Sequence, residues 1–217
     1  MKTDSQIQQD VIAELKWEPS INAAEVGVEV KNGVVTLAGH VASYGEKWDA
    51  ERAAQRVAGV KALAVEIDVA LGGGSKRNDA DIARSVENVL EWTSFLSKDP
   101  IKVMVENGWV TLSGEVLWDY QRQAAKLAVR YLMGVTGVSD QITIRNRVTS
   151  TNVKTDIEAA LKRRASNEAQ QITVAVTGYV VTLTGNVHNW AERDLVTHSA
   201  WCTPGVSNVV DNIKVTY

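Results

Sequence analysis

The chain is poor in the residue types that most often carry chemistry, with one cysteine and three histidines among 217 residues. The single thiol, Cys202, excludes an intramolecular disulfide and any zinc site built from several cysteines. His40, His188 and His198 have no carboxylates at a recurring ligand spacing around them. We therefore expect no metal site.

Motifs of the common enzyme classes are also missing. The sequence contains no GxSxG, HExxH, GxxxxGK(S/T) or GxGxxG. The GGGSKR run at 72–77 lacks the spacing, the preceding strand and the following helix of a phosphate-binding loop. Cys202 has no visible base beside it, which favours an inert thiol over a nucleophile. These absences predict a protein that is not an enzyme, with no catalytic residue and no cofactor.

Long hydrophobic runs are absent as well. No segment approaches the roughly 18 apolar residues that span a bilayer. The N-terminal MKTDSQIQQDVIAEL has no apolar core of the kind found in secretory signals. We expect a soluble, cytoplasmic protein, whereas a leader removed beforehand would indicate the periplasm.

Neither sign of charge dominates, because 23 basic residues stand against 26 acidic ones, a net charge of −3. Nucleic-acid-binding proteins carry a basic patch or stripe, so we expect no nucleic-acid partner. Residues 1–71 contain 7 basic and 11 acidic groups (7 − 11 = −4), whereas 72–147 have a net charge of +1 and 148–217 are neutral. An anionic surface is therefore not expected to meet the first part of the chain.

The sequence does contain a ten-residue motif that occurs three times. VKNGVVTLAG at 30–39 recurs as VENGWVTLSG at 105–114 and, altered, as VTGYVVTLTG at 176–185. Asn-Gly between alternating apolar residues predicts a β-hairpin with a type I′ turn, because both turn residues need positive φ. A glycine in the first turn position suits the related II′ turn of the third copy. The last glycine of each motif, called here the closing glycine (Gly39, Gly114 and Gly185), predicts a bulge or a tight exit from the hairpin. The structural motif residues are Asn32, Gly33, Gly39, Asn107, Gly108, Gly114, Gly178 and Gly185.

The elements that flank the hairpin repeat with it. A helical pattern precedes each hairpin and a second follows it, starting at the N-caps Ser43, Asp119 and Asn189, before a last alternating strand. Each unit is thus predicted to be α-β-β-α-β, and a right-handed crossover makes its last two strands parallel. The fold class is α+β: three tandem domains, each a three-stranded mixed sheet with two helices packed on one face. The predicted domains are 1–71, 78–147 and 148–217, with a Gly-rich linker at 72–77. Because that linker is flexible, we expect the second and third domains to associate closely and the first to move.

The helix–hairpin–helix–strand order, the NGxVTLxG hairpin and a later glycine-valine turn together resemble the BON domain (bacterial OsmY and nodulation), in three tandem copies. The glycine-valine turns are at Gly59-Val60, Gly134-Val135 and Gly205-Val206. The resemblance implies a bacterial protein that associates with phospholipid or membrane surfaces in osmotic or envelope stress, or has a transport-associated role. It supplies no set of lipid-binding residues.

Seven tryptophans against one phenylalanine is an unusual ratio. Trp17 and Trp92 follow the first helix of their units at equivalent positions, and we interpret them as core or rim packing. Amphipathic indoles at the edge of a small domain suit a bilayer interface or a protein interface. The candidate membrane-binding or ligand-binding residues are Trp109, Trp118, Tyr120 and Trp190.

The sheet face that carries no helices must either face solvent or bind something. In the second and third units this open face is nearly uncharged, and we expect it to pack against another unit, another subunit or a ligand. The favoured function is a non-enzymatic binding protein at a phospholipid surface. The first alternative is a transport-associated protein that holds a small solute or ion, as a homo-oligomer. The second is a protein–protein adaptor.

Overall fold

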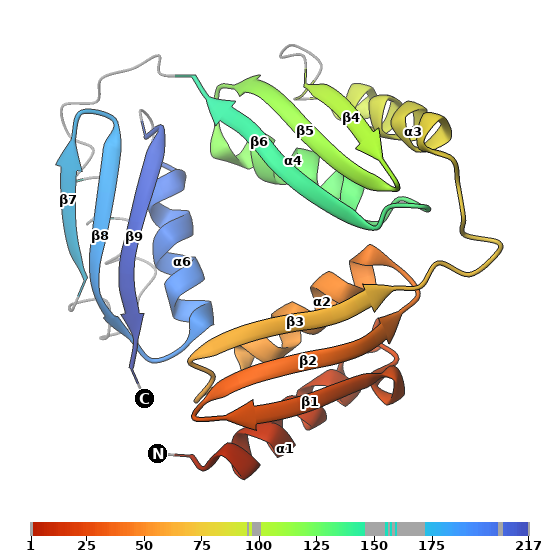
Figure 1. The fold of residues 1–217 in the computed structure, drawn as a ribbon. Helices are drawn as coiled ribbons and strands as arrows, with labels where there is room; N and C mark the ends of the chain where they lie inside the picture. The colour runs from red at the N-terminus through yellow and green to blue at the C-terminus, as the bar shows by residue number, and fades with distance from the viewer. Residues whose placement is uncertain are drawn as a thin grey trace.

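A computed structural model of the chain describes residues 2–94, 96, 101–145, 155, 157, 159, 172–203 and 206–216. Figure 1 shows three similar units, each a small sheet with two helices against it in the first two units and one helix, α6 (Trp190–Trp201), in the described part of the third. The fold class is α+β, as predicted.

The first two units contain the same α-helices and strands in the same order, and the first also has a short 3₁₀-helix. The first unit consists of α1 (Asp4–Trp17), the 3₁₀-helix η1 (Ala23–Glu25), β1 (Val26–Lys31), β2 (Val34–Val41), α2 (Tyr44–Arg56) and β3 (Ala62–Val69). The second consists of α3 (Asp79–Trp92), β4 (Lys102–Glu106), β5 (Trp109–Val116), α4 (Asp119–Arg130) and β6 (Gly137–Ile144).

The described part of the third unit consists of β7 (Thr173–Thr177), β8 (Val180–Val187), α6 (Trp190–Trp201) and β9 (Asn208–Val215). Its predicted first helix lies largely outside the described residues. Residues 155, 157 and 159 are helical, and Ile157 is fully buried in the core of this unit.

Each sheet is mixed, as predicted. The middle strand of each unit pairs antiparallel with the strand before it and parallel with the strand that returns after the second helix. Three separate clusters of buried apolar side chains fill the space between sheet and helices, one cluster for each unit. The units are therefore three domains with their own cores.

The hairpin turns have the predicted geometry. Asn32 and Gly33 both have positive φ, 54° and 79°, and Asn107 and Gly108 repeat this with 51° and 77°. Gly178 has a φ of 61° at the first turn position of the third unit. The Asn-Gly pair is thus required by the backbone conformation, because few other residues adopt positive φ without strain.

The closing glycines end the hairpin pairing, as predicted, but not the middle strand, which continues beside its parallel partner. Gly39 pairs with Val26 and Ile67 on its two sides, and β2 continues to Val41. Its φ is 137°, and a Cβ atom built there would overlap the carbonyl oxygen of Glu25. Glycine is therefore needed where the middle strand passes under the end of η1.

One helix start was predicted one residue late. The N-cap of α4 is Trp118, and Asp119 is the first helical residue. The Gln121 side chain accepts a hydrogen bond from the backbone N–H of Trp118 at 3.0 Å. Ser43 and Asn189 cap α2 and α6 as expected.

Replacing Gly39 by alanine should destabilise the first domain by about 2–3 kcal/mol, because the added Cβ meets backbone at a positive φ. The change would be measured as a lower midpoint of urea unfolding. Gly73→Ala in the linker is the matched control, since nothing lies within 4 Å of its Cβ position. Equal midpoints for the two variants would show that the strand can relax around the methyl group.

Candidate interaction surfaces

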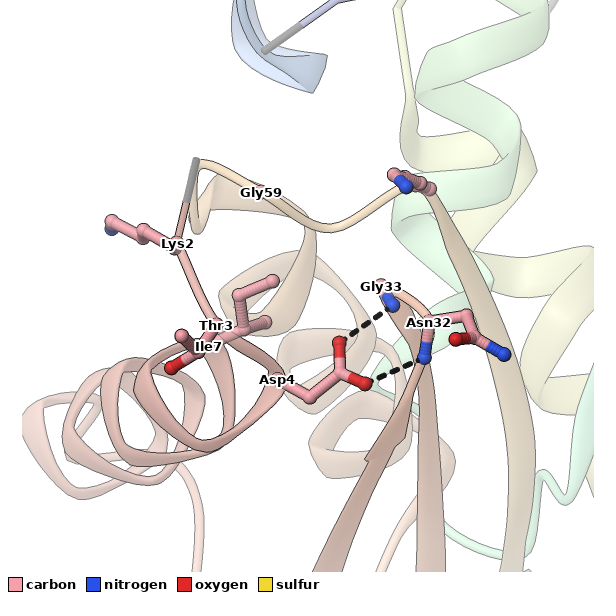
Figure 2. Close-up of a pocket in the computed structure, with 8 residues that line it drawn as sticks. Lys2, Thr3, Asp4, Ile7, Asn32, Gly33 and Gly59 are labelled. Atoms are coloured by element: carbon pink, nitrogen blue, oxygen red, sulfur yellow. Dashed lines mark hydrogen bonds between the residues drawn. The ribbon is translucent and has the colours of Figure 1, made fainter.

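A carboxylate at the start of the first helix holds the hairpin turn. Asp4 accepts hydrogen bonds from the backbone N–H groups of Asn32 (2.7 Å) and Gly33 (2.9 Å), one on each carboxylate oxygen, as Figure 2 shows. Charge-assisted hydrogen bonds of this kind are stronger than neutral ones. Asp4 therefore ties the N-terminus of α1 to the turn between β1 and β2.

The second unit repeats this contact. Asp79 accepts from the N–H groups of Asn107 (2.8 Å) and Gly108 (2.9 Å). Both aspartates precede their turn asparagine by 28 residues (32 − 4 and 107 − 79), whereas the third unit has Ser150 at that distance before Gly178. This spacing is visible in the sequence and was missed, because the aspartates looked like ordinary N-terminal helix residues.

A cavity of about 320 Å³ lies beside the clamped turn of the first unit (Figure 2). It is lined by Lys2, Thr3, Asp4, Ile7, Asn32, Gly33, Gly59 and Lys61. Two of its charged groups already have partners within the fold, because Asp4 holds the turn and Lys2 pairs with Asp10 at 2.7 Å. The cavity therefore follows from how the helix meets the turn.

The contacts between units come from the second helices, which lie toward the middle of the molecule in Figure 1. At the junction of the third and first units, the Trp190 indole N–H donates to the carbonyl oxygen of Val60 at 2.9 Å. Asp194 forms an ion pair with Arg52. The first half of α6 therefore meets the second half of α2 and the turn after it.

The first and second units also meet through their second helices, α2 and α4. The guanidinium of Arg130 lies 3.4 Å from the centroid of the Trp48 ring, and Arg130 is only 9% exposed. The Tyr131 hydroxyl donates to Asp49 at 3.2 Å, and the Tyr131 ring covers Gly45 so closely that a Cβ there would overlap it. The first half of α2 thus meets the end of α4.

The second and third units complete the pattern. Arg122, in the first half of α4, lies 4.6 Å from the ring centroid of Trp201 at the end of α6. At each of the three junctions, the first half of one second helix contacts the end of the next. Repeated head-to-tail contacts of this kind close into a ring when the rotation between units allows it. The three domains therefore form a closed ring with approximate threefold symmetry, which we call the domain ring.

Two expectations about domain packing were wrong. The first unit was expected to move independently, but it contacts both of the others in the ring. Of the three expected partners of the open sheet faces, another unit of the chain is wrong for the second unit, because Met104 and Trp109 on its open face are 61% and 51% exposed. The reason is that aromatic and arginine side chains on the second helices make the contacts instead.

The junction of the first and second units contains ionisable groups that burial perturbs. Burial raises the pKa of the Glu51 carboxyl above its ordinary 4.5, and attraction to Lys47 and Arg130 offsets only part of this. Burial also raises the pKa of the Tyr44 hydroxyl, and the nearby Glu51 charge raises it further. The Arg130 charge and a hydrogen bond with the Val138 backbone lower this pKa, but only in part. Tyr44 packs against the core cluster of the second unit.

The structure does not gather the four candidate residues into one site. Trp190 is engaged in the ring through its hydrogen bond to Val60. Trp109 is the first residue of β5, and Trp118 lies two residues beyond its last residue. Because this eight-residue strand is roughly 25 Å long, the two indoles are far apart. Trp118 and Tyr120, at the start of α4, are 37% and 52% exposed and form the one neighbouring pair.

Trp17 and Trp92 contradict their interpretation as core or rim packing. They are the last residues of α1 and α3, and they are 83% and 88% exposed. Both stand 22 residues before the closing glycine of their units (39 − 17 and 114 − 92). The pattern i, i+4, i+8 of the buried face, Ile7, Val11 and Leu15 in α1, excludes the position of Trp17. The helical period could therefore have shown from sequence that these indoles face outward.

Within the described ranges, no group of three or more His, Cys, Asp or Glu residues could hold a metal ion. The exposed Cys202 has the His198 ring nitrogen 3.3 Å from its sulfur, one helical turn away. Among the same described residues, no helix is both long and apolar enough to cross a membrane.

Replacing Asp79 by asparagine should weaken the second domain by about 1–2 kcal/mol, because one of two charge-assisted hydrogen bonds to the turn loses its acceptor. Chemical denaturation would measure the loss. Asp68→Asn, on the exposed open face of the first unit, is the control and should leave stability unchanged. A loss below about 0.3 kcal/mol for Asp79→Asn would show that water replaces the carboxylate at the turn.

Glu51→Gln should stabilise the protein at pH 7 more than at pH 4. A carboxyl with a raised folded-state pKa favours folding when protonated, and this contribution is lost as the pH rises through that pKa. The amide has no charge to desolvate, so the difference in Tm between variant and wild type should grow with pH. Glu66→Gln, on the exposed open face, is the control. A lower Tm for Glu51→Gln at pH 7 would mean that attraction to Lys47 and Arg130 outweighs burial.

Among solved structures, the chain is similar to the C-terminal domain of CdsD, the structural protein of the type III secretion system of Chlamydia trachomatis. The sequence identity is 14% and the TM-score 0.27, over 96% of each chain. A second structure of CdsD has 15% identity and a TM-score of 0.27, over 96% of this chain and 91% of that one. No curated protein matches the chain.

The family comparison covers nearly the whole sequence. The model of the BON domain matches residues 3–70, 78–146 and 149–217, so each matched range contains one of the three sheets described above. The resemblance inferred from the hairpin motif is thereby confirmed. The chain belongs to the BON domain family and contains three tandem copies of the domain.

Proposed function

We propose that this protein binds phospholipid surfaces peripherally, without catalysis, as part of a bacterial response to osmotic or envelope stress. Membership of the BON family supports the class of function, which the sequence resemblance implies. The observation that carries the proposal is the exposure of indole rings on a closed ring of domains. Trp17, Trp92, Trp109 and Trp118 are each more than a third exposed.

The tryptophans divide into two groups with different surroundings. Trp48, Trp190 and Trp201 contact other domains within the ring. The four exposed tryptophans lie at helix ends or on an open sheet face, and each leaves a large part of an apolar ring in water. Such rings prefer the region between lipid head groups and acyl chains. A chain folded only for its own stability has no need to expose them.

Two other functions remain as alternative outcomes of the test. The binding of a small solute or ion has the cavity beside Asp4 in its favour, and oligomers of this chain would add further clefts. An adaptor function has Met104 and Trp109 on the open face in its favour, because exposed apolar side chains also suit protein partners.

The proposal predicts that nitroxide-labelled phosphatidylcholine vesicles quench part of the tryptophan fluorescence of the full chain. Quenching should be partial, because the ring tryptophans stay away from lipid. An unrelated soluble protein rich in tryptophan, at the same concentration, is the control for collisional quenching. Unchanged emission, together with no co-sedimentation with vesicles, would reject phospholipid binding. A rise in Tm with a panel of ions and small solutes would then favour the solute-binding alternative.

A further inference from the structure

The exposed ends of α1 and α3 form an equivalent pair within the domain ring. Trp17 and Trp92 end their helices at the same register and are the two most exposed large apolar side chains among the described residues. Figure 1 shows α1 and α3 away from the middle of the molecule, where α2 and α4 lie. Among the residues that the structure describes, no contact explains why both units have an indole at this position.

The ring geometry places these two indoles relative to each other. Equivalent residues of units related by a rotation axis lie at the same height along that axis. Trp17 and Trp92 therefore emerge on the same side of the domain ring, one from each unit. A flat surface can meet both at once, whereas a small globular partner would contact one.

The charges around the two indoles indicate which kind of flat surface fits. Beside Trp17, the side chains of Glu14 and Glu18 both bind Arg56, at 2.9 and 3.2 Å. Lys16 is exposed next to this indole, so the charges around it balance. Beside Trp92, Glu87 and Glu91 are exposed on the last turns of α3. Within the part of the chain that the structure describes, no basic cluster flanks either indole. An anionic surface would therefore gain no attraction at Trp17 and would be repelled at Trp92, so a surface without net charge is favoured.

We propose that Trp17 and Trp92 insert together into the interface of an uncharged, zwitterionic phospholipid bilayer, so that one side of the domain ring rests on the membrane. This inference rests on the proposed phospholipid binding and assigns its site and its lipid class. Because both anchors belong to one rigid ring, the second inserts at a high effective concentration once the first is bound.

The test is co-sedimentation of the full chain with phosphatidylcholine vesicles, comparing wild type with Trp17→Ala, Trp92→Ala and the double variant. Each single change should weaken partitioning about tenfold, because an indole contributes a large apolar area. The double variant should lose about a hundredfold. Both residues are exposed, so folding should be unaffected, and circular dichroism verifies this.

Leu127→Ala is the matched control, since it removes an exposed apolar side chain from α4 that belongs to none of the candidate binding residues. Its partitioning should stay within twofold of wild type. Gly45→Leu tests the ring geometry, because its side chain is driven into Tyr131 at the junction of the first and second units. Misaligned anchors should reduce the partitioning of this variant to that of a single-tryptophan variant.

The outcomes separate this inference from the proposed function. Vesicle binding by wild type that the double variant retains within twofold would overturn the anchor assignment and leave phospholipid binding in place. No binding by wild type to any vesicle would overturn both. Stronger binding when a fifth of the lipid is replaced by phosphatidylglycerol, lost in high salt, would overturn the assignment to uncharged lipid. Full affinity of Gly45→Leu would overturn the role of the ring.

Discussion

The architecture depends on contacts between an arginine and an indole at the ends of neighbouring helices. Each domain has a core shared by a three-stranded sheet and its helices, and a domain of about 65 residues is marginally stable alone. The stacking of Arg130 on Trp48 and of Arg122 on Trp201 joins these domains through their second helices. A desolvated cation–π pair is worth about 2 kcal/mol, which is substantial for units of this size. Three small domains thereby become one body.

The three junctions use the same surfaces but different chemistry. Arg130 and Trp201 occupy equivalent positions, 16 residues after their closing glycines (130 − 114 and 201 − 185). The end of the second helix therefore supplies the cation at one junction and the aromatic ring at another. The third junction uses the ion pair of Asp194 with Arg52 and the hydrogen bond of Trp190. In the reverse order of units, Arg122 would face Arg52, whereas in the observed order each of these arginines faces a ring or a carboxylate. This mismatch disfavours the reverse order.

The ring also explains why the open sheet faces and the ends of the first helices are exposed. With the second helices turned inward, each sheet presents its bare face outward, and α1 and α3 lie away from the middle (Figure 1). Side chains such as Met104 and Trp92 are exposed as a result. A binding function then requires no preformed cleft, only side chains held at fixed separations on a rigid frame. This suits recognition of an extended surface better than chemistry on a small substrate.

Local rules were enough to predict the domain architecture. The Asn-Gly turns, the alternation of the strands and the helical period are set by backbone conformation and nearest-neighbour packing, so they can be read along the chain. The clamp from Asp79 to Asn107 could also have been found, because its 28-residue spacing repeats. What only the tertiary structure decided is which surface residues meet. Trp190 contacts Val60 across 130 positions of sequence, whereas Trp17 contacts solvent. The side chain is the same at both positions. Whether it contacts another domain or solvent depends on the orientation of whole domains, which no local pattern encodes.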